Sequence, residues 1–162
     1  MFEQEIDPGP SGIGGWLILP TLGLFLTPLI VGYQLITIFV PIFTNGTFET
    51  LTTPGSEAFH PLWASLLIFE IISNILVVAF ALALIVLEFM KVRFFPALMI
   101  AYFAFKFCML VVDHLFSMQI PLIAEQDPSL FTPDFIGALV GTFVWIPYFL
   151  VSKRVKNTFY AR

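Results

Sequence analysis

The chain has 162 residues, of which 59% are hydrophobic, 17% aromatic and 11% charged, whereas an ordinary soluble domain carries about 25% charged residues. The mean hydropathy of +0.96 indicates that lipid solvates most of the chain. The net charge of −4 and the single cysteine, Cys108, exclude a general nucleic-acid surface, an intrachain disulfide and a dithiol redox pair.

The chain begins with an acidic arm, residues 1–12, whose proline and glycine residues do not form a stable helix. The apolar run that follows is too long for the h-region of a signal peptide, and it predicts a retained first span over 14–43. Thirty helical residues would measure about 45 Å, but a bilayer core is about 30 Å thick. Because Pro20, Pro28 and Pro41 lie inside this run, we expect a kink, a strong tilt or an interfacial first segment.

Three more apolar runs predict spans over about 61–90, 94–117 and 134–151, followed by a basic tail over 152–162. Apart from Lys106, the basic residues lie in the turn after the second span or in the tail: Lys91, Arg93, Lys153, Arg154, Lys156 and Arg162. The positive-inside rule then places the arm, this turn and the tail in the cytoplasm. The predicted fold is an all-α membrane protein with four transmembrane helices in an antiparallel bundle.

The third span carries the polar residues that an apolar helix accommodates least easily. Tyr102, Lys106 and Asp113 recur close to whole helical turns, and His114 follows directly. Lys106 and Asp113 are separated by about 10 Å along one helix face. Charges within a membrane span usually face a bundle interior or a water-filled cavity, so this stripe is the first candidate site.

The second span contributes Glu70 and Asn74 on one stripe. Counting about 1.5 Å per residue from the expected membrane boundary places Glu70 between Lys106 and Asp113 in depth. An ion pair between Glu70 and Lys106 is therefore feasible, and it has two interpretations. It either locks two helices together, or Glu70 titrates with Lys106 as its counter-ion while Asp113 and His114 provide access from outside.

Four glycines are candidate packing positions. Gly14 and Gly15 before the first span either allow a flexible chain or let another helix or a partner approach closely. Gly137 and Gly141 have the spacing that permits close helix contact, either within the bundle or in a homodimer.

No pattern in the sequence predicts a metal site or a cofactor. Glycine-rich phosphate loops, zinc-ligand spacings and nucleophile elbows are missing. His60 and His114 are expected at different depths, which disfavours axial haem ligation. Glu88 and Lys91 stand three residues apart and are interpreted as an interfacial pair on one helix.

Both ends of the chain resemble a known family. The motif Gly12–Leu17 (GIGGWL) precedes the first span, and Trp145–Leu150 (WIPYFL) leads into Ser152–Phe159 (SKRVKNTF). These motifs resemble the domain-of-unknown-function 2569 family, which comprises small bacterial inner-membrane proteins with four predicted spans. The resemblance implies a multi-pass protein of the bacterial inner membrane, and it implies no activity.

The sequence leaves two functions open. The first is a non-catalytic accessory, assembly or interaction subunit, in contact with lipid and with a membrane-protein partner or further copies of itself. The alternative is a small proton-coupled transporter or permeation protein that uses the Glu70, Lys106 and Asp113 cluster. An enzyme is not expected, because the sequence offers no paired acid and base or metal cluster. A water-filled cavity that reaches Glu70 and Lys106 would favour transport.

Overall fold

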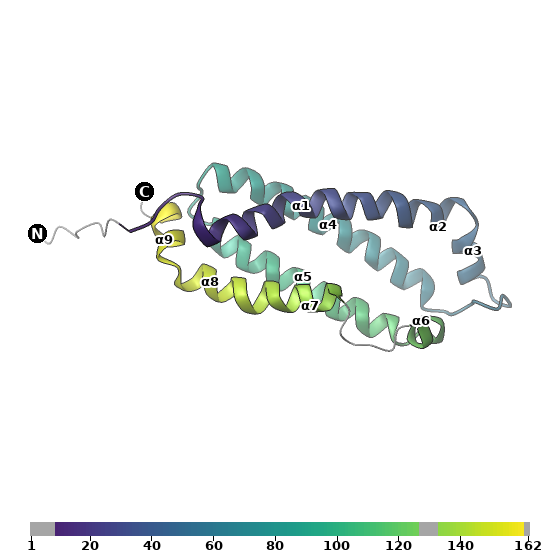
Figure 1. Cartoon of the computed structure of the whole chain (residues 1–162). Helices are drawn as coiled ribbons and strands as arrows, with labels where there is room; N and C mark the ends of the chain where they lie inside the picture. The colour runs from purple at the N-terminus through teal and green to yellow at the C-terminus, as the bar shows by residue number, and fades with distance from the viewer. Residues whose placement is uncertain (1–8, 127–132, 161–162) are drawn as a thin grey trace, which may run out of the picture.

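The structure is a computed structural model that describes residues 9–126 and 133–160, and these ranges contain helices and no strands. The three acidic residues of the arm, Glu3, Glu5 and Asp7, and the end of the tail lie outside the described residues. The helical elements, shown in Figure 1, are η1 (Gly15–Leu17), α1 (Ile18–Gln34), η2 (Leu35–Phe39), α2 (Val40–Thr44), α3 (Thr47–Thr52), α4 (Trp63–Phe89), α5 (Phe95–Ser117), α6 (Pro121–Gln126), α7 (Pro133–Val140), η3 (Gly141–Trp145), α8 (Ile146–Val151) and α9 (Lys153–Phe159).

Three helical runs are long and apolar enough to cross a membrane: Gly15–Thr44, Trp63–Phe89 and Phe95–Ser117. A fourth span is present if Phe135–Val151 and Lys153–Phe159, which bend by 64° at their junction, count together. The expected all-helical architecture is therefore confirmed, with three to four candidate spans.

The first span is a continuous helical run in which the helix type changes. Proline has no N–H, and in a regular helix the ring of Pro41 would clash with the carbonyl of Thr37. The chain forms a π-helical turn, η2, just before Pro41, and the Val40 N–H donates to the Leu35 carbonyl. This wider turn accommodates the proline. The kink, tilt or interfacial segment expected for the first span stays a prediction.

The last span repeats this arrangement. A second π-helical turn, η3, comes just before Pro147 in α8. At Ser152 the backbone becomes extended, and its hydroxyl accepts a hydrogen bond from the Val155 N–H. Ser152 thereby ends α8 and caps the start of α9, which leaves the axis of α8 at a steep angle.

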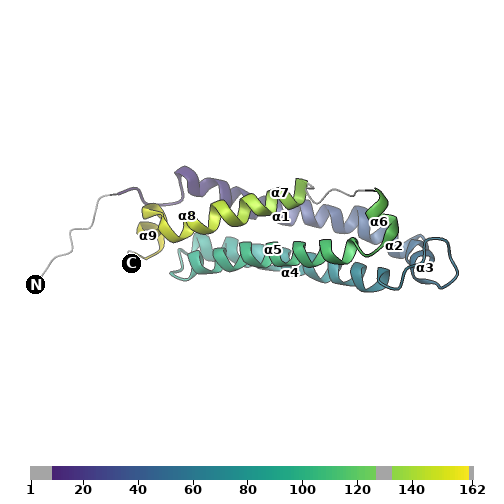
Figure 2. The ribbon, with the colours of Figure 1, turned by 90° about the horizontal axis from the view of Figure 1, so that it is seen from below.

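The spans pack in a row. The helix α1 packs on α4, α4 on α5, and α5 on η3 and α8. Among the described helices, α1 does not pack extensively against α7, η3 or α8, so the row does not close into a ring. Figure 1 shows α1 and the α7–α8 arm lying nearest to each other at the end that carries both termini. Figure 2 shows α4 and α5 side by side along their length.

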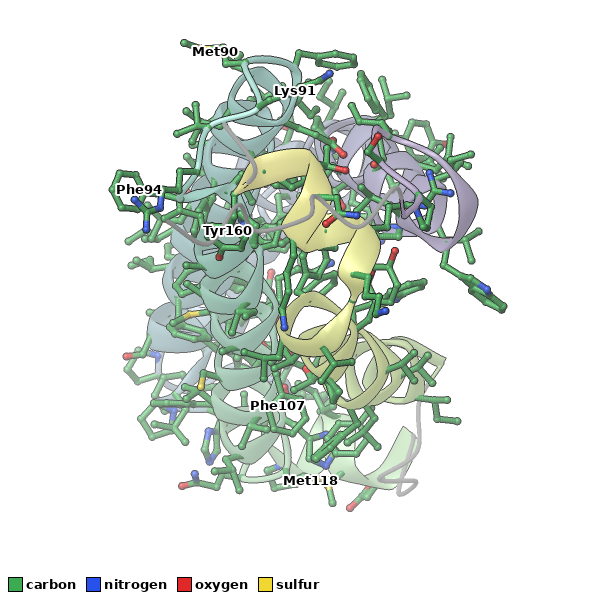
Figure 3. The ribbon with its side chains drawn as sticks, turned by 90° about the vertical axis from the view of Figure 1, so that its left-hand side faces the viewer. Met90, Lys91, Phe94, Phe107, Met118 and Tyr160 are labelled. Atoms are coloured by element: carbon green, nitrogen blue, oxygen red, sulfur yellow. The ribbon has the colours of Figure 1, made fainter. Side chains whose placement is uncertain are left out.

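Two apolar clusters hold the ends of the molecule. The cluster at the terminal end joins η1, α1, α4, α5, α8 and α9, and its buried members include Leu17, Leu84, Phe95, Val155 and Phe159. Figure 3 looks onto this end and shows α9 lying across it. The opposite cluster is centred on Trp63, Leu66, Leu67 and Ile120, beneath α3 and α6.

Candidate functional site

A cavity of about 910 Å³ occupies the middle of the molecule, between the two apolar clusters. The helices α4 and α5 form its floor, α1 and η2 form one wall, and α7 and η3 form the other. We call this cavity the polar groove because its polar lining residues are Thr27, Gln34, Glu70, Ser73, Asn74, Tyr102, Lys106 and Asp113. Each wall contains a π-helical turn, whereas the floor helices are regular α-helices.

The polar residues reach the groove because of their helical spacing. On α4, Glu70, Ser73 and Asn74 stand three and four residues apart and share one helix face. On α5, Lys106 and Asp113 are separated by about two turns and share the face that meets α4. Five of the six residues predicted for the intramembrane cluster, Glu70, Asn74, Tyr102, Lys106 and Asp113, thus line one cavity.

Glu70 lies against Asp113. The two carboxyl groups lie close enough to interact electrostatically. A hydrogen bond between two carboxyl groups requires that one of them carries a proton, because an ionised carboxylate can only accept. Asp113 Oδ1 is buried and has no hydrogen-bond partner. Two carboxyl groups this close can share one proton, so the pair forms a site that can hold a proton.

Lys106 lies on α5, seven residues before Asp113, and lines the same groove. Its Nζ is 5.6 Å from the centre of the Tyr102 ring, at a distance typical of cation–π contact. The Tyr102 hydroxyl in turn donates to Thr27 Oγ1 of α1, at 3.4 Å. A direct ion pair between Glu70 and Lys106 stays a prediction, although both residues line the same groove.

His114 lies next to the groove lining. Its ring centre is 6.0 Å from that of Phe135, and its Nε2 is buried without a hydrogen-bond partner. Among the described residues, no three His, Cys, Asp or Glu side chains gather in a way that could hold a metal ion.

The four predicted packing glycines fall into two groups. A Cβ added to Gly137 would meet no atom within 4 Å, and one added to Gly141 would meet the Phe103 ring at an ordinary 3.5 Å. Both residues line the groove and help to keep it wide. At the terminal end, a Cβ on Gly14 would come within 2.9 Å of Arg154 Nη1, and Gly15 has a φ of +54°.

Arg154 fixes the N-terminal segment to α9. Its Nη1 donates to the carbonyls of Ser11 at 3.2 Å and Gly12 at 3.4 Å. The Gly12 N–H donates to Thr158 Oγ1 at 2.9 Å. The two motifs at the ends of the chain therefore meet in space, where they close the terminal end of the molecule.

Glu88 is the residue that the sequence analysis misread. It is fully buried at the terminal end of α4, and Thr21 Oγ1 of α1 donates to its Oε1 at 2.5 Å. Its Oε2 has no hydrogen-bond partner. The interpretation of Glu88 as an interfacial partner of Lys91 is thus replaced by a buried contact between α1 and α4. The signal was available, since Glu88 lies on the stripe of Glu70 and Asn74, close to five turns after Glu70.

Comparison with known proteins gives a family and no activity. The model of a family described as a protein of unknown function, DUF2569, matches residues 10–160. No curated protein and no solved structure matches the chain.

Proposed function

Because the chain belongs to the DUF2569 family, whose description gives no activity, we propose a function from the polar groove: a small proton-coupled transporter or permeation protein. The observation that carries this proposal is a cavity of about 910 Å³ that reaches Glu70, Lys106 and Asp113 together. Charged side chains in a membrane span are costly, and they are typical of substrate pathways and proton relays.

The proposed topology has four spans in an antiparallel bundle, with both termini in the cytoplasm of a bacterial cell and the bundle in its inner membrane. The basic residues support it. Lys91 and Arg93 lie between α4 and α5, and Lys153, Arg154 and Lys156 lie in α9, at the same end of the molecule. Basic residues collect on the cytoplasmic side of membrane proteins.

The Glu70 and Asp113 carboxyl pair supplies the chemistry for proton coupling. When Glu70 and Asp113 share one proton, the pair carries one negative charge, and a second negative charge beside it would be costly in a cavity of low dielectric constant. A cationic group that enters the groove can stabilise the doubly ionised pair. Binding of one cation then releases one proton, and reprotonation releases the cation.

The walls fit an amphipathic organic cation. Apolar residues of both walls and of the floor, such as Leu24 on α1, Trp145 on η3 and Met99 on α5, surround the polar side chains. Aromatic and apolar walls with few polar groups are typical of small-molecule sites. The cluster around Leu84 and Phe159 closes the terminal end, so movement of a solute through the membrane would require α1 and the last span to separate there.

Tetraphenylphosphonium is the probe for this proposal, and the measurement combines binding to the purified protein with proton release in weak buffer. We expect binding with release of about one proton. Glu70→Gln and Asp113→Asn should each abolish the proton release and weaken binding at least tenfold. Glu125→Gln, in exposed α6, is the matched control and should change neither quantity. Binding without proton release, or binding that Glu70→Gln leaves intact, would contradict the proposal.

An accessory or assembly subunit without catalytic activity is the second candidate function. In the apolar segment of the first span, 11% of the residues are buried, whereas 22% are buried in the corresponding segment of each of the next two spans. Such a bare helix could pack on another membrane protein or on a second copy. A photocrosslinker at Leu29, which is 69% exposed, should then capture a partner in native membranes, whereas one at Val151 on the last span should not. The absence of any crosslinked species at Leu29 would remove this candidate.

A further inference from the structure

A second cavity, of about 460 Å³, lies between α5, α8 and α9. Its volume is within the range of about 300–1,000 Å³ for small-molecule sites. Five of its lining residues are apolar: Pro96, Ala97, Ile100, Phe149 and Leu150. The other two, Lys156 and Tyr160, come from α9 and the residue that follows it. We call this cavity the α9 pocket.

The amphipathic character of α9 gives the pocket its polar edge. Val155, Thr158 and Phe159 are buried and fix α9 to the end of the bundle. Lys156 and Tyr160 are four residues apart on the outer face, and both are exposed. Figure 3 shows Tyr160 on the side of α9 that faces α5.

The pocket lies where a membrane surface is expected. The helix α9 bends by 64° away from α8, which is the end of the candidate fourth span. Leu150, which lines the pocket, and Val151 are 58% and 70% exposed, as expected for side chains that face lipid. Tyrosine and lysine are enriched at this depth because an apolar stem can lie in the acyl region while the polar tip reaches the headgroups.

The charge around the pocket is positive. Lys91 and Arg93 lie in the turn just before Pro96, and Lys153 is on the first turn of α9. None of the described residues that line the pocket is acidic. Since each basic residue near the surface attracts anionic lipid by about 1 kcal/mol, this charge favours a negatively charged headgroup.

We propose that the α9 pocket binds an anionic phospholipid. One acyl chain lies on the apolar wall made by Ile100, Phe149 and Leu150, and the phosphate contacts the Lys156 ammonium and the Tyr160 hydroxyl. The combination of an apolar cavity open to lipid and a cation at its headgroup end is what identifies the ligand class. The proposal depends on the chain spanning a membrane, and it does not depend on transport.

The acidic arm is the competing occupant. Glu3, Glu5 and Asp7 lie outside the described residues, but they belong to the same end of the chain as the Arg154 contact with Ser11 and Gly12. A carboxylate from this arm could pair with Lys156 in place of a phosphate. The experiment must therefore distinguish a lipid from the arm.

The test measures lipid binding to the purified full-length protein in detergent by native mass spectrometry. The probes are phosphatidylglycerol and phosphatidylcholine with identical acyl chains. Phosphatidylglycerol should bind at least fivefold more tightly. Lys156→Glu removes a cation and adds an anion, so it should reduce this preference by at least about fivefold, the ratio that corresponds to one lost basic contact alone. Lys153→Glu makes the same charge change on an exposed residue that does not line the pocket. It therefore measures the part of the preference that surface charge alone supplies, and its loss should be at least twofold smaller than the loss for Lys156→Glu.

Ala97→Trp tests the pocket itself. Ala97 is exposed and lines the cavity, so the indole would fill the acyl site, and binding of both lipids should fall at least tenfold without loss of the folded protein. Equal binding of the two lipids, or equal losses for Lys156→Glu and Lys153→Glu, would overturn the proposal. Phosphatidylglycerol binding that appears only after removal of residues 1–8 would assign the pocket to the acidic arm instead.

Discussion

The terminal end and the polar groove each hold a glutamate on α4, and the two environments are opposite. Glu88 is fully buried, and Thr21 donates to it within a dense apolar cluster. Glu70 faces a second carboxyl group in a cavity of about 910 Å³. The two residues stand on the same stripe, separated by about 27 Å along the helix. Residue type and helix face therefore do not distinguish a structural carboxyl from a candidate site.

The difference comes from the elements around α4. At the terminal end, η1 and α9 fill the space between the first span and the last span, and Arg154 ties the two chain ends together. In the middle of the molecule, no described element fills that space. Gly137 and Gly141 have no side chains to narrow the groove there. The same row of helices is thus closed by its short terminal segments and open where they are missing. Three pairs of substitutions can break or sharpen this comparison.

The largest effect is expected from a cavity in the closed end. Leu84 is fully buried in the terminal cluster, so Leu84→Ala should lower the free energy of unfolding by about 2–5 kcal/mol. Leu110 lines the groove and is only partly buried, so Leu110→Ala should cost about 1 kcal/mol. Unfolding by sodium dodecyl sulfate titration in mixed micelles measures both values. Equal losses would mean that the two regions are packed alike.

A smaller effect is expected from the buried contact between α1 and α4. Thr21→Val keeps the shape of the side chain and removes the donor to Glu88, leaving a buried carboxyl without any partner, so we expect a loss of about 1–3 kcal/mol. Ser73→Ala removes the hydroxyl that contacts Met109 Sδ beside the groove, and it should cost less than about 0.5 kcal/mol.

The double variant Thr21→Val with Glu88→Leu gives the control. It replaces both buried polar groups by apolar ones, and it should recover much of the stability that Thr21→Val loses. If the double variant is less stable than Thr21→Val alone, Glu88 has a partner other than Thr21, and the account of the closed end given above fails.

The sequence predicted the helical architecture and the face on which the polar residues lie, because both depend on local spacing. Hydropathy over long runs identified the spans, and helical periodicity placed Glu70, Lys106 and Asp113 in one cavity. The sequence analysis did not predict that Glu70 lies against Asp113. A shift of one helical turn, about 5.4 Å, exchanges one partner for another, and such a shift depends on contacts between helices.

Two other features were not predicted from the sequence, because they also depend on contacts between elements that are distant along the chain. Glu88 stands near a turn, where a surface pair is the usual arrangement, and only the structure shows that it is buried and bonded to Thr21 of α1. The glycines before the first span allowed either flexibility or a close approach. The structure brings the Arg154 side chain onto Gly14 and Gly15, a contact between residues about 140 positions apart that no local pattern contains.

The smallest effects are expected from Gly15→Ala and Gly137→Ala. These two substitutions should change the stability in opposite directions. Gly15 has a φ of +54°, where a Cβ costs about 1–2 kcal/mol, and its Cβ would lie 3.3 Å from Arg154 Nε, so this substitution should destabilise the closed end. Gly137 is helical and has open space around it, so alanine there should gain about 0.5–1 kcal/mol from reduced backbone freedom in the unfolded chain. The melting temperature in detergent should therefore fall for Gly15→Ala and rise for Gly137→Ala. A lower melting temperature for both variants would mean that another helix or a second copy packs on Gly137. The groove would then be narrower than the structure shows.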